Sequence, residues 1–417
     1  MKKIKIISAI VMLMFLLTQV LGCSGGQKAA PVEETIRIGT IFPLSGPSAL
    51  NGQDTFDGAD IARELFNDKG GINGKKVVYV SADAPDANAA TQEADRLISK
   101  EKVPVILGTQ SSSLAFAASA VAERNKVVYW EVEGIADNIT SRNFKYVFRS
   151  TFSASNMGLQ MVNFVKDVYA PKMGKTIQDL KIALVYEDGA FGSSTAKTIQ
   201  DLSKELGFTF VKEASYSAKS NELNSLVIDL KAKKPDVLFA ASYVNDAILL
   251  SRTSEELGFK PGIIIGTTAG HGTPDYVKAM GDKSNGVFAA GIPNAVNPDN
   301  MKPEQKDLYN ELTKRYKAKR NKDISVNVLN GFNGAWILLS KVLPNAKEMT
   351  ADNIRDVALN TTMAKGDTVL GYGVKFAGPD APNSGQNVEA FAGVMQWQEG
   401  KLYTVFPEII ALKQPKF

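Results

Sequence analysis

The stretch IRIGTIFPLSGPSALNGQDTFDGADIARELFNDKGGINGKKV, residues 36–77, contains the repeating unit that decides the fold. It opens with the β-branched run IRIGTIF (36–42) and reaches the next apolar run, KKVVYV (75–80), after a segment of helical length. Short β-branched runs that alternate with helical stretches are typical of parallel sheets with crossover helices. The sequence therefore predicts an α/β fold.

Further apolar runs extend this pattern in two series. The first series adds PVILG (104–108) and VVYW (127–130), and the second contains KIALVY (181–186), FTFVKEA (208–214), PDVLFAA (235–241) and GIIIGTT (262–268). Between the runs, apolar residues recur at helical spacing, which predicts helices packed on a sheet. Two series of about four strands each predict two Rossmann-like lobes with parallel-rich sheets.

The remaining segments indicate where the chain crosses between the lobes. We expect the first crossing within 144–158, a return after GVFAAGIPNA (286–295), and two helices near 304–319 and 325–343. The segment VMQWQEGKLYTVF (394–406) alternates around Glu399-Gly400 and predicts a β-hairpin, which needs a third crossing to reach a covering sheet. The predicted lobes comprise 35–152 with about 292–370, and 153–291 with about 371–417.

The N-terminus has the pattern of an export signal with a lipid anchor. Residues 1–22 carry three early lysines and a long apolar run, which is typical of a secretory signal peptide. The only cysteine of the chain, Cys23, follows directly and resembles the acylated residue of a bacterial lipobox. The alternative is a plain signal peptide with an incidental cysteine. Residues 23–34 lack apolar periodicity and are interpreted as a flexible tether.

Composition and charge exclude several classes of function. Removal of the signal would leave 45 of the 48 basic residues against 44 acidic ones, a net charge of +1, which gives no reason to expect a nucleic-acid partner. One Cys and one His exclude a disulfide framework and a Cys/His metal cluster. No GxSxG, HExxH or GxxxxGK[ST] motif is present, so no catalytic residue, metal or cofactor is expected.

Candidate ligand-binding residues follow the predicted strands, because ligands of open α/β sheets bind beyond the carboxyl ends of the strands. Asn51 lies in the segment after the first strand, and Ser111, Ser112 and Ser113 stand between the third strand and a helix. Hydroxyls beside the free N–H groups of a helix start favour a carboxylate or anion site. N-capping, which needs only one serine, is the alternative.

The loop after the fourth strand carries Glu131 and Glu133, which could bind a cation such as an amine or could be solvated charges. In the second lobe, the segments 186–194 and 241–247 offer Phe191 and Tyr243 as aromatic walls. His271 could line the same opening, although a single His is more often a loop residue than a catalyst.

Taken together, the N-terminal signal, the opening stretch, ILGTQSSSLAFAASAVAERNKV (106–127) and QWQEGKLYTVFP (396–407) resemble one family across nearly the whole mature chain. This family is the type I periplasmic binding proteins of the leucine/isoleucine/valine class, the extracytoplasmic receptors of ABC importers. Its members take up branched-chain and other hydrophobic amino acids, amides and related small acids. The resemblance implies a two-lobe clamshell with three crossovers and a ligand closed between the lobes.

The resemblance also assigns roles to residues. Ser112, with Ser113 beside it, matches the serine that holds the ligand carboxylate, and Phe191 and Tyr243 match aromatic wall positions. Glu133 and Ile135 stand where the family has a small residue and a hydroxyl, and Thr268 stands where amino-acid binders have the carboxylate that pairs with the α-ammonium. A buried ammonium without a countercharge is costly. Either Glu133, Glu131 or Asp246 supplies that charge, or the ligand is not a standard α-amino acid.

The sequence thus predicts a monomeric, extracytoplasmic solute-binding lipoprotein, anchored through Cys23, that captures an amino-acid-like, amide or carboxylate solute by hinge closure. Its expected partners are the small-molecule solute and the permease subunits of an ABC importer. A ligand-sensing receptor of the same fold is the first alternative. An extracytoplasmic hydrolase is the second, and it would have to use His271 as its only imidazole base.

Overall fold

The structure is a computed structural model that describes residues 34–292 and 301–417. The predicted signal peptide, Cys23 and residues 23–33 of the tether lie outside the described residues. Residues 36–417 form one compact unit.

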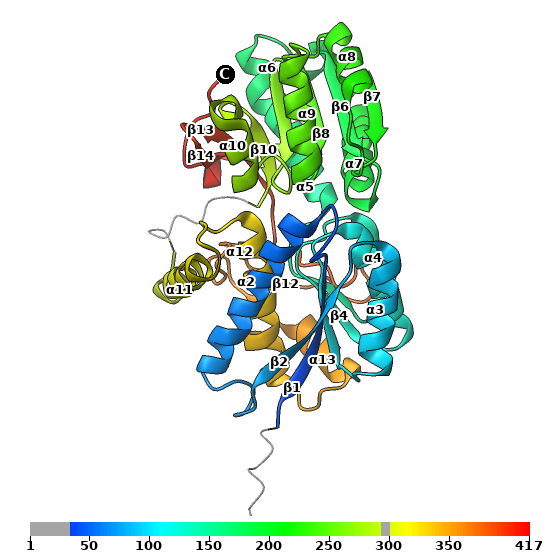
Figure 1. Cartoon of the computed structure of the whole chain (residues 1–417), viewed down its shortest axis with the longest axis vertical. Coiled ribbons are helices and arrows are strands. Elements are labelled where there is room, and N and C mark those ends of the chain that lie inside the picture. Colours follow the sequence, from blue (N-terminus) through cyan, green and yellow to red (C-terminus); the bar gives the residue numbers. More distant parts are fainter. Residues whose placement is uncertain (1–33, 293–300) are drawn as a thin grey trace, which may run out of the picture. The chain divides into compact units, whose positions relative to one another are not determined.

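A parallel five-stranded sheet forms the centre of the first lobe (Figure 1). Its strand order is β2-β1-β3-β4-β5, and β1 pairs with β2 in a register that sets Ile36 opposite Val77. The strands are β1 (Ile36–Phe42), β2 (Val77–Asp83), β3 (Val105–Gly108), β4 (Val128–Glu131) and β5 (Val147–Arg149). The last five residues of β1 are buried, as expected for a central parallel strand with helices on both faces.

Alternate residues of β1 enter two different cores. Ile38 and Phe42 pack with α2 (Ala49–Asp68), whereas Ile41 packs with α3 (Ala87–Ser99) and α4 (Ser112–Arg124). Successive side chains of a strand point to opposite faces, so this division follows from the strand period of two.

The second lobe is built on a seven-stranded sheet of order β14-β13-β10-β9-β8-β6-β7. The strands from β6 to β10 are parallel, while β13 is antiparallel to β10 and to β14. The strands are β6 (Ile182–Glu187), β7 (Phe210–Tyr216), β8 (Val237–Ala241), β9 (Ile263–Thr267), β10 (Phe288–Gly291), β13 (Gly393–Gln398) and β14 (Lys401–Phe406). The helices are α5 (Ala154–Phe164), α6 (Ala170–Lys172), α7 (Ala190–Leu206), α8 (Asn224–Lys233), α9 (Val244–Glu256) and α10 (Pro274–Met280).

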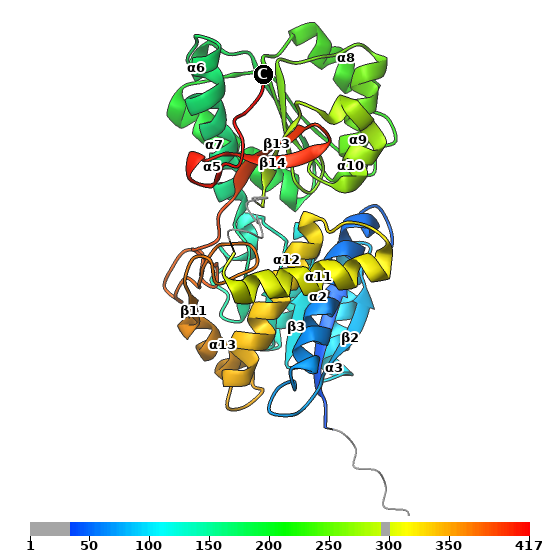
Figure 2. The ribbon, with the colours of Figure 1, turned by 90° about the vertical axis from the view of Figure 1, so that its left-hand side faces the viewer.

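After β10 the chain returns to the first lobe and adds three helices, of which the first two lie beside α2 in Figure 2. They are α11 (Pro303–Arg320), α12 (Val326–Ile337) and α13 (Ala351–Asn360). A Cβ at Gly58 of α2 would lie 2.0 Å from Val328 O, and one at Gly331 of α12 would lie 1.9 Å from Thr55 O. The two glycines therefore allow α2 and α12 to pack backbone against backbone.

The last crossing lies later than the sequence predicted. Two short strands, β11 (Thr362–Met363) and β12 (Val374–Lys375), pair with each other, and Phe376 packs edge-on against Trp130 at 5.2 Å and Phe148 at 5.4 Å. These rings belong to the core of the first lobe. The boundary expected near 371 is therefore corrected to the residues just before Gly393, because this aromatic cluster holds the intervening segment on the first lobe.

All eight predicted strands are present, with ends displaced by up to three residues, and the hairpin turns at Glu399-Gly400 as expected. The estimate of about four strands per lobe was too low. It missed the three-residue β5 and did not count β10, and the hairpin adds two strands to the second sheet. The expected segment 286–295 is described only as far as residue 292.

Candidate functional site

A narrow cavity lies where the two lobes meet, at the carboxyl ends of their parallel strands. Its volume is about 30 Å³, measured as the space open to the centres of water-sized molecules. The lining comes from both lobes and consists of Gln110, Ser112, Glu133, Ile135, Phe152, Met157, Phe191, Tyr243, Thr267, Thr268, Ala269, Ile292 and Asn330. A space of this size holds one or two waters, so the surrounding side chains nearly fill it.

Hydrogen bonds between the lobes surround the cavity. Asn51 Nδ2 donates to Ala269 O over 2.8 Å, and Ala190 N donates to Ser113 Oγ over 3.2 Å. Asp137 N donates to Ser194 Oγ over 3.0 Å. These bonds join the start of α2, the start of α4 and the loop after β4 to the opposite lobe, so the lobes are closed on each other. Asn51 and Ser113 thus lie outside the cavity wall and contact the opposing lobe instead.

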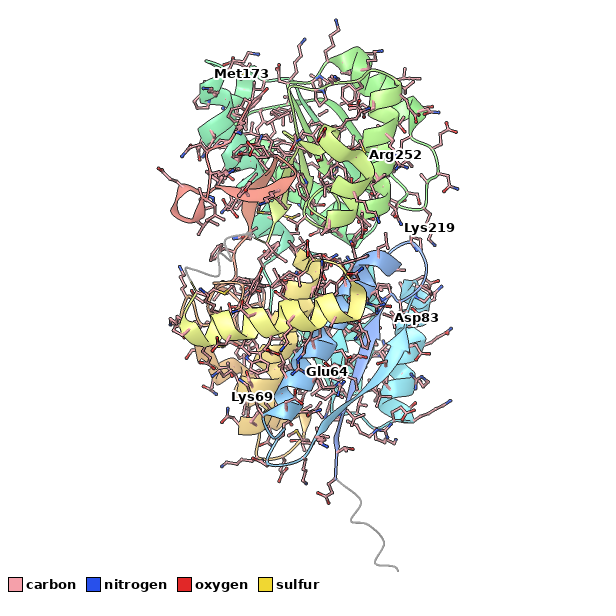
Figure 3. All side chains as sticks on the ribbon, turned by 60° about the vertical axis from the view of Figure 1, so that its left-hand side comes forward. Glu64, Lys69, Asp83, Met173, Lys219 and Arg252 are labelled. Atoms are coloured by element: carbon pink, nitrogen blue, oxygen red, sulfur yellow. The ribbon has the colours of Figure 1, made fainter. Side chains whose placement is uncertain are left out.

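A second contact lies at the outer rim. Asn245 Nδ2 donates to Pro47 O over 2.8 Å, beside a wider surface groove that includes Lys219 and Arg252. Figure 3 labels Lys219 and Asp83 from opposite lobes on the same side of the molecule. Relative movement of the lobes would therefore change the distances across this rim.

Ser112 lies at the start of α4 and faces the cavity. Its Oγ accepts hydrogen bonds from Ile135 N and Ala136 N, both over 3.1 Å. The hydroxyl thereby ties the loop after β4 to the helix and keeps its own hydrogen for a further acceptor. Ser111 is the N-cap residue of α4 and lies outside the wall, where its side chain interacts with the hydroxyl of Tyr243.

Glu133 places a carboxyl group in the cavity wall with only 8% of the residue exposed. Burial raises the pKa of this carboxyl well above its usual range, and the nearby carboxylates of Glu131 and Asp54 raise the pKa further. Thr55 Oγ1 lies within hydrogen-bond distance of Glu133 Oε2 and 2.8 Å from Asn51 O. A hydroxyl has one hydrogen, so a protonated Glu133 that donates to Thr55 satisfies both bonds.

Glu131, the last residue of β4, has a structural role. Its carboxylate accepts hydrogen bonds from Thr109 N at 2.7 Å, Gly134 N at 2.6 Å and Tyr129 OH at 2.8 Å, as well as from Glu133 N. The possibility that Glu131 contacts the ligand is corrected, because its carboxylate accepts hydrogen bonds that hold the loops in place and lies outside the cavity.

Two other sequence candidates also lie outside the cavity. Asp246 accepts a hydrogen bond from Tyr216 OH over 2.7 Å, and burial raises its pKa to about 7. His271 is fully buried, its ring lies 5.1 Å from that of Tyr276, and burial lowers its pKa to about 4. Neither the possible countercharge Asp246 nor His271, which could have lined the opening, lies in the cavity wall: Asp246 lines the rim groove, and His271 is packed into the second lobe.

The second lobe contributes an aromatic wall. The rings of Phe191 on α7 and Tyr243 at the N-cap of α9 lie 5.0 Å apart at 42°. Thr268 follows β9 beside them and donates its backbone N–H to Ala290 O over 2.8 Å. Together with Ser112, Glu133 and Ile135, these three residues are the sequence candidates that the structure brings into one cavity wall.

Seven lining residues were not predicted. They are Gln110, Phe152, Met157, Thr267, Ala269, Ile292 and Asn330. Gln110 and Thr267 are immediate neighbours of the predicted residues Ser111 and Thr268, so the sequence could have indicated them. Asn330 carried none, because α12 reaches the cavity only through its close packing on α2.

Among the described residues no group of His, Cys, Asp and Glu side chains is arranged to hold a metal ion. Within 34–292 and 301–417, no helix combines the length and apolar character needed to span a membrane.

Two α/β lobes that close over a cavity lined from both sides define a two-lobed binding protein. Comparison with known proteins gives the family. Residues 35–401 match the family model described as "Periplasmic binding protein", and the chain belongs to this family. It is a solute-binding protein, not an enzyme, and it acts outside the cytoplasm.

Individual relatives agree with this assignment. The chain is 35% identical over 387 residues to the Leu/Ile/Val-binding protein homolog 7 of Brucella suis, covering 93% of this chain and 95% of the relative. In fold it is similar to the branched-chain amino acid transporter substrate binding protein LivJ from Streptococcus pneumoniae in complex with isoleucine, with a TM-score of 0.73, 21% identity and coverage of 88% and 98%. It is equally similar to a solute binding protein of an ABC transporter from Rhodopseudomonas palustris in complex with 3,4-dihydroxy benzoic acid, with a TM-score of 0.73, 20% identity and coverage of 89% and 95%.

Proposed function

We propose that this protein is the extracytoplasmic receptor of an ABC importer and captures a small solute by closure of its two lobes. The observation that carries the proposal is a cavity lined from both lobes and surrounded by hydrogen bonds that cross between them. A solute that contacts both walls favours the closed form by the difference between its affinities for the closed and the open form. The closed form then docks on the permease and releases the solute chemically unchanged.

The proposed ligand-binding residues are those that line the cavity. Ser112, Glu133 and Ile135 act from the first lobe, and Phe191, Tyr243 and Thr268 act from the second. Asn51, Ser111 and Ser113 assist closure by contacting the opposite lobe. Buried polar groups discriminate between solutes, because each group left without a partner costs about 1–3 kcal/mol.

Solute capture is tested by mass spectrometry of small molecules released when the freshly purified protein is denatured. A released compound should then raise the melting temperature of the protein saturably, because a ligand that binds only the folded state stabilises it. If no compound is released and no solute in a broad panel shifts the melting temperature, the proposed function fails.

We further propose that the mature protein is a monomer held to the membrane by acylation of Cys23. The supporting observation is the lone cysteine placed directly after a signal-type apolar run. Each buried acyl CH₂ contributes about 0.8 kcal/mol, so several chains on one residue give firm attachment. Cys23→Ser should move the protein from the membrane fraction to the soluble fraction, and unchanged fractionation would contradict the anchor.

A further inference from the structure

The described part of the cavity wall contains one acidic group and no basic group to balance it. Among the described residues that line it, none is a lysine, an arginine or a histidine, and Glu133 contributes a carboxyl group. Glu187 and Asp246 are also buried, and both interact electrostatically with Tyr243 in the wall. Arg149 is a buried cation in this region, and it interacts with Glu131 and Asp137 behind the wall. The surroundings of the cavity therefore favour positive charge.

The neutral polar groups of the wall also present acceptors. Gln110 Oε1 and Asn330 Oδ1 are buried, have no hydrogen-bond partner within the part of the chain that the structure describes, and belong to residues that are each 3% exposed. They come from different elements, the loop before α4 and the helix α12, yet both residues line the same cavity. Buried acceptors normally have donors, so two orphaned oxygens beside a carboxyl group point to a solute rich in N–H donors.

Three donors that could hold an anion already have acceptors, whereas the hydroxyl hydrogen of Ser112 is left for a solute. Ile135 N and Ala136 N both donate to Ser112 Oγ. Thr267 Oγ1 donates to Ser242 O over 2.7 Å and is not free for a ligand carboxylate. A carboxylate in this cavity would lie near Glu133, and no described residue of the wall supplies a cation to balance its charge.

The remaining wall suits a cation with an apolar body. Phe152, Phe191 and Tyr243 present aromatic rings, whose faces attract ammonium groups, and Ile135, Met157 and Ile292 supply aliphatic contact.

We propose that the solute is a small organic cation, an amine with an apolar body and no carboxylate, whose ammonium group pairs with Glu133 and donates to Gln110 Oε1 and Asn330 Oδ1. This inference rests on the proposed function and names its substrate class. Glu133 contacts the solute directly, whereas Thr55 positions the carboxylate by donating to it once the ammonium is bound.

The test is calorimetric and thermal-shift titration of the full-length protein with matched probes. Isobutylamine and isoamylamine are compared with valine and leucine, which add an α-carboxylate to the same bodies, and with isobutyramide and isovaleramide, which remove the charge. The amines should bind at least about 100-fold more tightly than either comparison set, the effect expected for pairing a buried charge.

Glu133→Gln preserves shape and removes the charge, so it should weaken amine binding by about 100-fold while the melting temperature without solute stays the same or rises. Glu205→Gln, the same change at an exposed position on α7, is the matched control and should alter neither quantity.

Valine or leucine binding as tightly as the amines would overturn the inference and leave the proposed function intact. Equal binding of the amides, undiminished amine binding by Glu133→Gln, a failure of both amines to bind, or release of an anionic or zwitterionic solute from the purified protein would also overturn it. Failure of the proposed function is a different result, in which no compound is released or bound.

Discussion

At the scale of single residues, Ser112 carries two roles at once. Its Oγ accepts hydrogen bonds from Ile135 N and Ala136 N, and the residue also lines the cavity. Ser112→Ala should therefore lower the free energy of unfolding by about 1–3 kcal/mol, because two buried N–H groups lose their acceptor. Urea unfolding measures this change. Ser155→Ala, at an exposed position on α5, is the control, and equal stability of the two variants would contradict the assignment.

The protonation of Glu133 should make amine binding depend on pH. Glu131 on β4, Asp54 on α2 and Tyr243 at the start of α9 face this carboxyl from the surrounding elements, and burial raises its pKa well above the usual range. Below the raised pKa, an amine must displace a proton from Glu133, so affinity should fall by up to about tenfold per pH unit. Titrations across pH measure the effect, and Glu133→Gln should remove it. A flat profile in the unmodified protein would contradict the role of Glu133.

The same raised pKa has a consequence for stability. The unfolded chain releases the Glu133 proton at a lower pH than the folded chain does, so the stability contributed by this group is lost as pH rises from the unfolded pKa through the folded one. Glu133→Gln should therefore raise the melting temperature relative to the unmodified protein in that pH range and have little effect below it. If Glu133→Gln raised the melting temperature only at low pH, this result would contradict a raised pKa of Glu133.

Glu131 and Glu133 show how much of the ligand-binding site could be predicted from the sequence alone. Both are acidic residues after the same strand, and the sequence offered both as ligand contacts. What separates them is the fixed geometry of the loops. Thr109, Gly134 and Tyr129 converge on Glu131, whereas Glu133 receives one hydroxyl. Tyr129 and Gly134 are near neighbours of Glu131, but Thr109 lies 22 residues away in the loop after β3, so the local pattern alone does not distinguish the two residues.

At the scale of elements, the contact between α2 and α12 places Asn330 at the cavity. Gly331→Ala would bring a methyl group 1.9 Å from Thr55 O and force the helices apart. In a free helix, alanine is favoured over glycine by about 1 kcal/mol, but overpacking here should lower the free energy of unfolding by about 3 kcal/mol.

Denaturant unfolding tests this expectation. Gly378→Ala, where an added Cβ meets nothing within 4 Å, is the matched control and should change stability by less than about 0.5 kcal/mol. A neutral or stabilising Gly331→Ala would show that the close helix contact does not matter.

The strands that the sequence predicted well are those with long β-branched runs, such as β1 and β9. Their alternation with helices is enough to indicate a parallel sheet. The strand β5 has only three residues and follows no helix of its own, so its periodicity was too short to detect. Ser112, Phe191 and Tyr243 could be predicted because each lies within four residues of the carboxyl end of a strand. Met157 and Asn330 lie on helices whose approach to the cavity depends on packing over long sequence separations.

At the scale of the whole molecule, solute capture depends on movement of one lobe against the other. Asn51, Ser113 and Ser194 each make a hydrogen bond between the lobes that water can replace when the lobes open. The closed form without solute should therefore be only weakly favoured. Contact with a solute on both walls adds the free energy that shifts the population.

The most direct measurement is the distance between spin labels on the two lobes. Asn88→Cys on α3 and Lys219→Cys after β7 are exposed positions of opposite lobes, and Cys23→Ser removes the only native thiol. Pulsed electron resonance should give a broad or long distance distribution in the solute-depleted protein and a shorter, narrower one when saturating solute is added. The same distribution with and without a solute that demonstrably binds would contradict capture by closure of the lobes.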